Sequence, residues 1–426
     1  MTTISRAFLA SLERLAANTA SGCGSGNAVW GISPAMLRIA AEMERIFQLP
    51  MPEAPGLCLV GGVVDAAAFD GVATSRTASV TGTGPDLLQA AGSCISEAVE
   101  FLSQWAPPDR EFAAATPAQI AHGWDSSAID QLLALFPVEA PSGAPRLRWA
   151  KGTLLARGSP VLLPASLCYR NVRDPGVPGP AIKLSSGCGA GQTIEQALLH
   201  ALLELVERDA IALWWLGGRA GRRLLPDDGL PPDLQCELQR AGSSRVSWLL
   251  DITTDLGVPC VVALSTDAKG RGLACGFAAR LAYPDAIRAA VFEMCQMEVG
   301  ISLLLLKRRQ LGDGALNDMD RLYLRRAFGF DVRGCPLLFP ERTMPDCALP
   351  SSDDSVPLDA LSRRLADAGV EAAWVDLTRP DLAIPAVRAL APGLQPYPSG
   401  LVLPRLERQI ERTGNGFGRA TGIRLM

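Results

Sequence analysis

The chain has 426 residues, of which 48% are hydrophobic and 20% charged, and its formal net charge is −4. These proportions are those of a globular protein with a large core, and the mild acidity offers no basic field for nucleic acid. The longest apolar run, Ile301 to Leu306, is too short to span a bilayer, and the N-terminal segment lacks the apolar region of a secretory signal.

The cysteines and histidines exclude several kinds of site. Eleven cysteines are scattered without a CxxC pair, which predicts buried, reduced thiols and suits a cytoplasmic protein. Only two histidines, His122 and His200, are available, so a Ser-His-Asp triad or a histidine-rich zinc site has little to draw on. His122 lies near an expected helix end, where we expect a structural role.

The first quarter of the chain is expected to begin with helices and continue with strands. Apolar periodicity predicts two helices over residues 4–48, with a Gly/Ser break at 21–27, and prolines 50, 52 and 55 end helix formation. Strands are expected at 57–64 and 73–81, the second ended by Gly82 and Gly84, and a helix at 86–104.

The remaining elements continue the mixture. A strand is expected around 162–163, and a long helix follows the run Gly187–Gly191 and ends near residue 215. Strands are expected at 246–251, 258–264, 274–278, 372–377 and 385–390, and helices at 284–311 and 358–368. Residues 312–357 are expected to form an irregular loop or lid. The mixture predicts an α/β or mixed α+β fold.

A strand, a glycine-containing turn and an acidic helix occur three times. A shift of 107 residues brings the second copy onto the first at Gly189 on Gly82, Gly191 on Gly84, Glu204 on Glu97 and Glu207 on Glu100. A shift of 89 residues brings the third copy onto the second at Gly276 on Gly187, Glu293 on Glu204 and Gln296 on Glu207. Residues i and i+3 share one helical face, so each helix presents two acceptor groups side by side.

These acidic pairs indicate a magnesium and phosphate site. A single Glu-x-x-Glu pair is most often a solvated face, but matched distances from matched glycines argue against that interpretation here. The flanking residues are mostly Ala, Leu, Val and Ile, and buried carboxylates need compensating cations. Oxygen ligands suit Mg²⁺, which bridges substrate phosphates. Arg208 and the N–H groups of the glycine-rich turns add anion-binding groups, although no Walker motif is present.

At these residues the chain resembles the YcaO family. The segments that carry the resemblance are Ser93-x-x-x-Glu97-x-x-Glu100, Ser185–Gly191, Glu204–Asp209 with Trp214-Trp215, Glu293-Met-Cys-Gln296, Leu250–Thr253, Val375–Pro380 and Pro392–Leu394. The resemblance covers about residues 57–397.

The resemblance implies a single YcaO-type domain that binds ATP and Mg²⁺. The implied magnesium ligands are Glu97, Glu100, Glu204, Glu207 and Glu293. The implied ATP-binding residues are Ser93, Ser186, Arg208 and Gln296. His200 matches Ser93 in position and is expected to support the site or pack, and no catalytic side chain is assigned.

Members of that family phosphorylate a peptide amide oxygen with ATP. The leading hypothesis is cyclodehydration, in which a Cys, Ser or Thr side chain of a ribosomally made peptide closes to an azoline. Peptide thioamidation with an external sulfur donor and a TfuA-like partner is the alternative. A further alternative is a non-catalytic scaffold subunit, which the intact acidic set disfavours.

Two departures from the family pattern affect the choice. Phe101 stands where the first motif often has Arg, and the C-terminal residues Gly422–Met426 are not the Pro-rich tail of many azoline-forming members. We expect residues 1–50 to be an N-terminal helical extension and candidate partner-docking surface, and residues 51–426 to be the catalytic domain. The expected partners are a precursor peptide and a separate leader-binding or TfuA-like protein, with a second copy of the chain as a further candidate.

Overall fold

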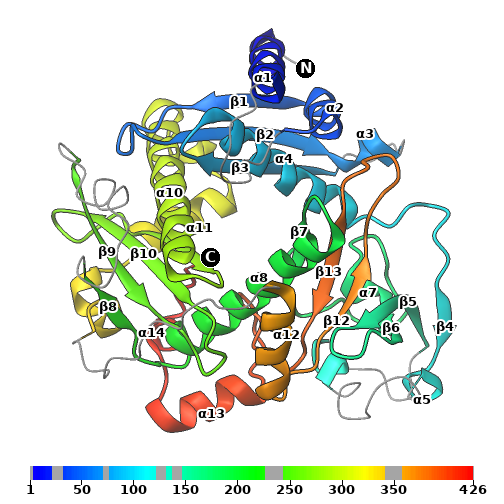
Figure 1. Ribbon diagram of the computed structural model, residues 1–426. Coiled ribbons are helices and arrows are strands. Elements are labelled where there is room, and N and C mark those ends of the chain that lie inside the picture. Colours follow the sequence, from blue (N-terminus) through cyan, green and yellow to red (C-terminus); the bar gives the residue numbers. More distant parts are fainter. Residues whose placement is uncertain are drawn as a thin grey trace. The chain divides into compact units, whose positions relative to one another are not determined.

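The computed structural model describes residues 3–21, 32–70, 76–120, 131–136, 146–225, 243–340 and 357–425. Two compact units are present (Figure 1). Unit 1 comprises residues 1–49, 58–205 and 356–403, and unit 2 comprises 50–57, 206–355 and 404–426. The boundary between them falls inside the long helix α8 (Ile194–Trp215).

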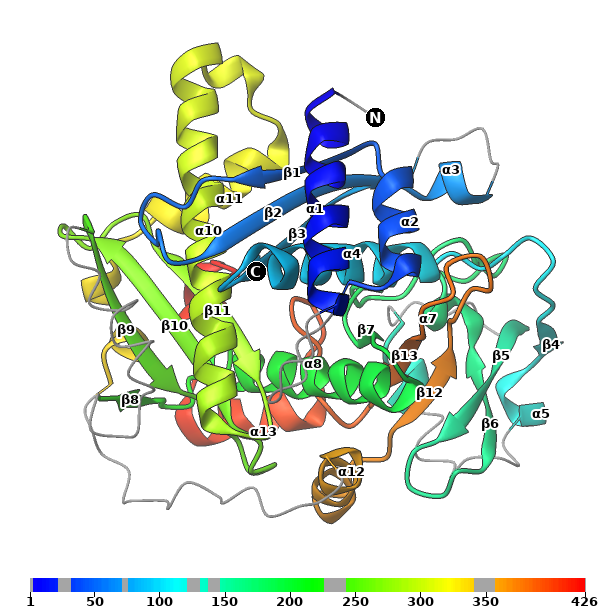
Figure 2. The same ribbon diagram turned by 45° about the horizontal axis from the view of Figure 1, so that its top comes forward.

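Unit 1 contains a three-stranded antiparallel sheet that carries the first acidic helix. Its order is β1 (Arg45–Leu49), β2 (Cys58–Asp65) and β3 (Thr77–Gly84). Helix α4 (Leu87–Ser103) packs on β2 and β3, and α1 (Thr3–Ser21) and α2 (Pro34–Glu42) pack beside it (Figure 2). Leu12, Ile39 and Met43 of this N-terminal region are buried in the same core as α4.

The second sheet of unit 1 positions the second glycine-rich turn. Its antiparallel order is β4 (Ala113–Ala115), β5 (Leu147–Leu154), β12 (Ala373–Asp376), β13 (Ala386–Leu390) and β7 (Cys188–Ala190), with β6 (Pro160–Pro164) paired to β5. β7 leads into α8. The remaining helices of unit 1 are α3 (Ala66–Asp70), α5 (Pro117–Ile120), α7 (Ala165–Cys168) and α12 (Pro357–Asp367).

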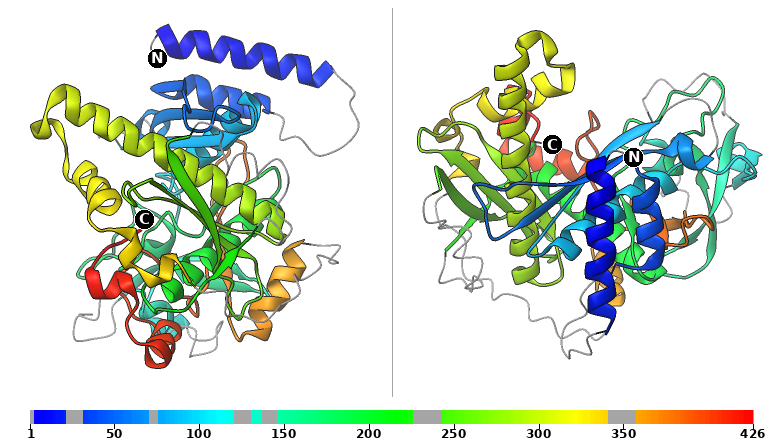
Figure 3. Two further views of the ribbon diagram at one scale, coloured as in Figure 1. Left: turned by 90° about the vertical axis from the view of Figure 1, so that its left-hand side faces the viewer. Right: turned by 90° about the horizontal axis from the view of Figure 1, so that it is seen from above.

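Unit 2 is built on a four-stranded antiparallel sheet. Its order is β11 (Ala274–Ala279), β10 (Cys260–Asp267), β9 (Arg245–Asp251) and β8 (Arg222–Leu224). Helix α10 (Tyr283–Leu311) packs on β10 and β11, and α11 (Asp318–Phe328) follows it after a short turn (Figure 3). The shorter helices are η2 (Asp313–Ala315), η3 (Val332–Gly334), η4 (Pro336–Leu338), α13 (Pro404–Thr413) and α14 (Phe417–Thr421).

Two long helices, α10 and the end of α8, are anchored in unit 2 by buried side chains. By length and composition α10 could cross a membrane, yet it packs on a sheet and carries the buried Glu298 in an ion pair with Arg245. The packing on the sheet and the buried ion pair are those of a helix that lies in the protein core. The C-terminal end of α8 is also held in place. Trp214 and Trp215 are fully buried, and the Trp215 Nε1–H donates to the Ile423 carbonyl at 2.7 Å.

Most expected elements are confirmed, two expectations are wrong and one is correct only in part. The last part of the segment expected to be helical forms β1, because residues 45–49 pair with β2. Gly82 lies within β3, where it still pairs with β2, and the strand ends at Gly84, so only the second glycine marks the end as expected. Residues 312–340 contain α11, whose start is fixed by a capping box between Asn317 and Asp320. Of the expected break at 21–27, Ser21 is the last residue of α1, and residues 22–27 lie outside the described residues, as does His122.

Candidate functional site

The first glutamate of each predicted acidic pair accepts from a backbone N–H in or directly before the strand that precedes its helix. Glu97 Oε2 accepts from the Thr81 N–H at 2.7 Å, and Glu204 Oε2 accepts from the Gly187 N–H at 2.9 Å. In unit 2, Glu293 Oε2 accepts from the Phe277 N–H at 2.8 Å. The donor lies 16 or 17 residues before the acceptor in each case. The same local arrangement therefore presents one carboxylate on each helix.

Glycines let these strands approach their helices closely. A Cβ added at Gly82 would lie 2.2 Å from the Ala90 carbonyl oxygen, and one at Gly189 would lie 2.3 Å from that of Ala197. At Gly276 the corresponding distance to the Ala290 oxygen is 2.0 Å. Any side chain would overlap the helix backbone, so glycine is required for the short strand-to-glutamate bonds.

Unit 1 gathers three carboxylates, on α4 and the first part of α8. The half-buried Glu100 accepts from the Ala190 N–H at 3.1 Å. Burial and the negative charges of Glu204 and Glu97 raise the pKa of Glu100 well above its usual value. The three charges are thus near enough to repel one another, and a bound cation would relieve this repulsion. The His200 Nδ1 lies 3.0 Å from the Ala190 carbonyl oxygen, which supports the strand that holds Glu100.

The remaining predicted ligands lie in unit 2. Glu207 is buried, with the Arg208 Nη1 3.7 Å from its Oε1. Glu293 and Gln296 are half-buried and stand three residues apart on α10, on the same helical side. Glu204 and Glu207 likewise stand three residues apart on α8.

The predicted phosphate-binding serines of unit 1 differ in exposure. Ser93 is exposed on α4, one turn before Glu97, whereas Ser186 is buried just before β7. The structure thus places Ser93 with the first carboxylate and Ser186 beside Gly187, the residue that holds Glu204.

The donor set fits magnesium by its chemistry. The carboxylate oxygens of unit 1, which lie beside backbone N–H groups, are suited to a hard cation and the phosphates that accompany it. Within the described ranges, no three His, Cys, Asp or Glu side chains already converge on one metal position. Glu97 and Glu204 are instead directed to backbone N–H groups, so binding a cation would use these carboxylates in a second role.

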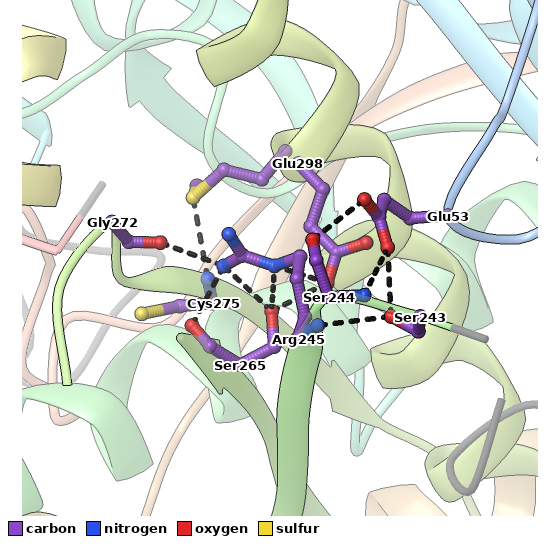
Figure 4. Close-up of polar contacts among 9 residues, drawn as sticks. Glu53, Ser243, Ser244, Arg245, Ser265, Gly272, Cys275 and Glu298 are labelled. Atoms are coloured by element: carbon purple, nitrogen blue, oxygen red, sulfur yellow. Dashed lines mark hydrogen bonds and ion pairs between the residues drawn. The ribbon is translucent and has the colours of Figure 1, made fainter. Parts of the chain in front are cut away.

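A polar cluster in unit 2 was not predicted from the sequence. The Arg245 Nε lies 3.0 Å from the Glu298 Oε1, and its Nη2 donates to the Gly272 carbonyl at 2.6 Å and the Ser265 hydroxyl at 2.9 Å (Figure 4). Glu53 accepts from Ser243 and Ser244 in the same cluster. Because Glu298 lies on α10, the cluster fixes the rotation of the helix that carries Glu293 and Gln296. Only tertiary pairing reveals it, since Arg245 and Glu298 are 53 residues apart.

Two arginines of unit 1 were also not predicted from the sequence to lie near the candidate site. The Arg170 guanidinium carbon lies 5.4 Å from the centroid of the Phe101 ring, so a cation stands over the position where the first motif lacks its usual arginine. Arg388 is 1% exposed on β13 and donates to the loop before β7. The cysteine prediction is supported within the described residues, where eight cysteines are free and all but Cys58 are buried.

Comparisons with known proteins agree with this picture. The family model described as YcaO cyclodehydratase, ATP- and Mg²⁺-binding, matches residues 81–395. An uncharacterized protein of Methanothermobacter thermautotrophicus is 27% identical over 335 residues, 74% of this chain and 81% of the relative. An uncharacterized protein in the tfuA 3′ region of Rhizobium leguminosarum bv. trifolii is 31% identical over 238 residues, 51% of this chain and 53% of the relative.

Solved structures show the same fold. A heterocyclase in complex with substrate and cofactor matches with a TM-score of 0.68 and 23% identity over 84% of this chain and 50% of that one. A Methanopyrus kandleri protein bound with AMPPCP and Mg²⁺ matches with a TM-score of 0.56 and 20% identity over 86% and 89%. The chain spans about half the length of the heterocyclase and of the Rhizobium relative.

Proposed function

The chain belongs to the YcaO family, and on this premise we propose that it uses ATP and Mg²⁺ to activate a peptide backbone amide. The observation that carries the proposal is the recurrence of a glutamate held by a preceding strand on α4, α8 and α10. A relative of the same fold that is bound with AMPPCP and Mg²⁺ supports the choice of cofactor.

The proposed roles follow the chemistry of the side chains. Glu97, Glu100 and Glu204 of unit 1 would hold magnesium, and the same role is proposed for Glu207 and Glu293 of unit 2. The residues proposed to bind the phosphates are Ser93, Ser186, Arg208 and Gln296. When bound, MgATP supplies the phosphoryl group, which passes to the amide oxygen as ADP leaves. The protein contributes positioning and charge compensation, which dominate phosphoryl transfer.

Cyclodehydration is the leading outcome of this activation. A Cys, Ser or Thr side chain of the precursor peptide would lose its proton and add to the amide carbon. Phosphate, which carries the former amide oxygen, then leaves, and the amide nitrogen loses its proton to give the C=N bond of the azoline. The matching family description as a cyclodehydratase favours this outcome.

Thioamidation is the second candidate, and one observation favours it. The Rhizobium relative lies in a tfuA region, and a TfuA-like partner is expected to deliver the sulfur donor. In this reaction a sulfide equivalent adds to the activated carbon and phosphate leaves, which replaces the amide oxygen by sulfur. We also propose a cytoplasmic location and a separate partner protein that presents the peptide. Docking on residues 1–50 stays a prediction, and so does a homodimer.

Intact mass spectrometry of a candidate precursor peptide tests the proposal. The peptide is incubated with the protein, its partner, ATP and Mg²⁺, with and without a sulfide source. Loss of one water per site identifies an azoline, and exchange of oxygen for sulfur identifies a thioamide. If the mass of the peptide does not change and no ATP is hydrolysed in the presence of a folded partner, the proposal is contradicted and a scaffold role is favoured.

Matched variants separate the site from the scaffold. Glu204→Gln is expected to abolish both ATP hydrolysis and peptide modification, because it removes a charge from the acidic set. Glu195→Gln, on the exposed first turn of the same helix, is the control and is expected to keep both activities. Full activity of Glu204→Gln would show that the metal assignment is wrong.

A further inference from the structure

Arg388 is a buried cation whose contacts are nearly all with one loop. It is 1% exposed on β13, and its Nη1 donates to the carbonyls of Leu184 and Ser186. The same nitrogen lies 3.5 Å from the Cys188 Sγ. In the part of the chain that the structure describes, no carboxylate pairs with Arg388, and its Nε has no hydrogen-bond partner.

The loop that Arg388 holds, residues 184–188, ends on the first residue of β7 and contains two residues of the candidate site. Ser186 is the predicted phosphate-binding serine, and the Gly187 N–H holds Glu204. The Gly187 carbonyl accepts from the Ala389 N–H at 2.7 Å, next to Arg388 in sequence. The loop is therefore fixed to β13 at two adjacent points, one a backbone bond and one a guanidinium.

Removing Arg388 is expected to loosen this loop more than the loss of one hydrogen bond between neutral groups would. The left-handed φ of +80° at Gly187 puts the loop in a conformation that local sequence preferences do not enforce strongly. One charged nitrogen, Nη1, donates to both carbonyls, and the charge strengthens each bond. A lysine keeps the charge but carries it on a compact ammonium and not on a planar guanidinium.

The charge of Arg388 also acts on the Cys188 thiol at the end of this loop. Burial raises the pKa of the Cys188 thiol to about 11, the positive charge of Arg388 opposes this, and the charges of Glu204 and Glu100 add to it. The thiol is therefore within electrostatic reach of the arginine and of both carboxylates.

We propose that Arg388 is a positioning residue that holds the loop 184–188, and through it Ser186 and Glu204, in the arrangement that binds the nucleotide. The contacts to the Leu184 and Ser186 carbonyls carry this inference. The part that concerns nucleotide binding rests on the proposed function. The part that concerns the loop does not.

Hydrogen exchange of the ligand-free protein tests the loop. Arg388→Met is expected to speed exchange of the amides at residues 184–189 at least about tenfold, the order expected for one lost hydrogen bond to a charged group. Arg388→Lys is expected to give a smaller increase, and it is the informative variant if the methionine variant does not fold. Arg379→Met is the matched control, because Arg379 is 5% exposed in the same unit but pairs with Asp381. Equal exchange of this loop in wild type and both Arg388 variants would overturn the inference.

Calorimetry with AMPPCP and Mg²⁺ tests the link to the nucleotide. Arg388→Met is expected to bind at least about tenfold more weakly than wild type, with Arg388→Lys between them and Arg379→Met unchanged. Normal binding by both Arg388 variants would overturn the inference and leave the proposed function standing. No binding by wild type would contradict the proposed function, and hydrogen exchange would then decide the loop assignment alone.

Discussion

Arg405 of α13 holds Asp209 of α8, with its Nε 2.9 Å and 3.0 Å from the two carboxylate oxygens. Asp209 is fully buried and directly follows the segment Glu204–Arg208. The Nη atoms of Arg405 bind a second carboxylate, that of Asp255. The acidic segment of α8 is therefore followed by an ion pair that fixes the helix within unit 2.

Loss of Arg405 is expected to destabilise the protein strongly. Arg405→Leu would remove the guanidinium that pairs with the buried Asp209 carboxylate, at a cost of about 3–5 kcal/mol in the free energy of unfolding. Urea unfolding followed by circular dichroism measures the change. Arg408→Leu, at an exposed position of the same helix, is the control and is expected to change stability by less than about 0.5 kcal/mol. Equal stability of the two variants would refute the importance of the pair.

The same arginine makes stability depend on pH. Its hydrogen bond lowers the pKa of Asp255 below the ordinary value of 3.8. The folded state thus favours the charged carboxylate, so this contribution is complete above the ordinary pKa and is lost as pH falls through the lowered one. Asp255→Asn is expected to be less stable than wild type at pH 6, with the difference shrinking below about pH 4. Urea midpoints at several pH values test this, and a constant difference would contradict it. Asp367→Asn, at an exposed position of α12, is the control.

Two glycines near α4 should respond in opposite directions to replacement by alanine. At Gly82 the added Cβ would lie 2.2 Å from the Ala90 carbonyl oxygen, so Gly82→Ala is expected to cost about 2 kcal/mol or more. At Gly92, inside the helix, the nearest atom is 3.9 Å away, so Gly92→Ala is expected to stabilise by about 0.5–1 kcal/mol. Thermal unfolding of both variants tests the close approach of β3 to α4. A stable Gly82→Ala protein would show that the approach is looser.

The Arg245–Glu298 pair should matter for α10 as a whole. Glu298→Gln keeps the shape of the side chain but removes the charge opposite a buried guanidinium, and it is expected to cost about 3 kcal/mol of stability. Glu407→Gln, exposed on α13, is the control. Chemical denaturation distinguishes them, and a loss no greater than that of the control would show that the buried pair is not a major anchor of α10.

The helices were predictable because their signals are local. The Asp86 side chain caps α4 by accepting from the Gln89 N–H at 2.9 Å, and the glutamates of all three acidic helices lie where helical spacing placed them. β1 was missed because five residues pair with a strand beyond a proline-rich segment. β7 is only three residues long and gains its pairing from β13, almost 200 residues later. Neither β1 nor β7 shows a periodic apolar pattern from which a strand could have been predicted.

The sequence by itself determined the acidic residues, their spacing on α4, α8 and α10, and the glycines that precede them, because helical periodicity and residue type are properties of short segments. Only the tertiary structure decided which partners hold these residues. Arg388 reaches Ser186 across 202 residues of sequence, and Arg405 reaches Asp209 across 196. Such pairs are fixed by the packing of whole elements, since burial makes an unpaired charge costly wherever its partner stands in the chain.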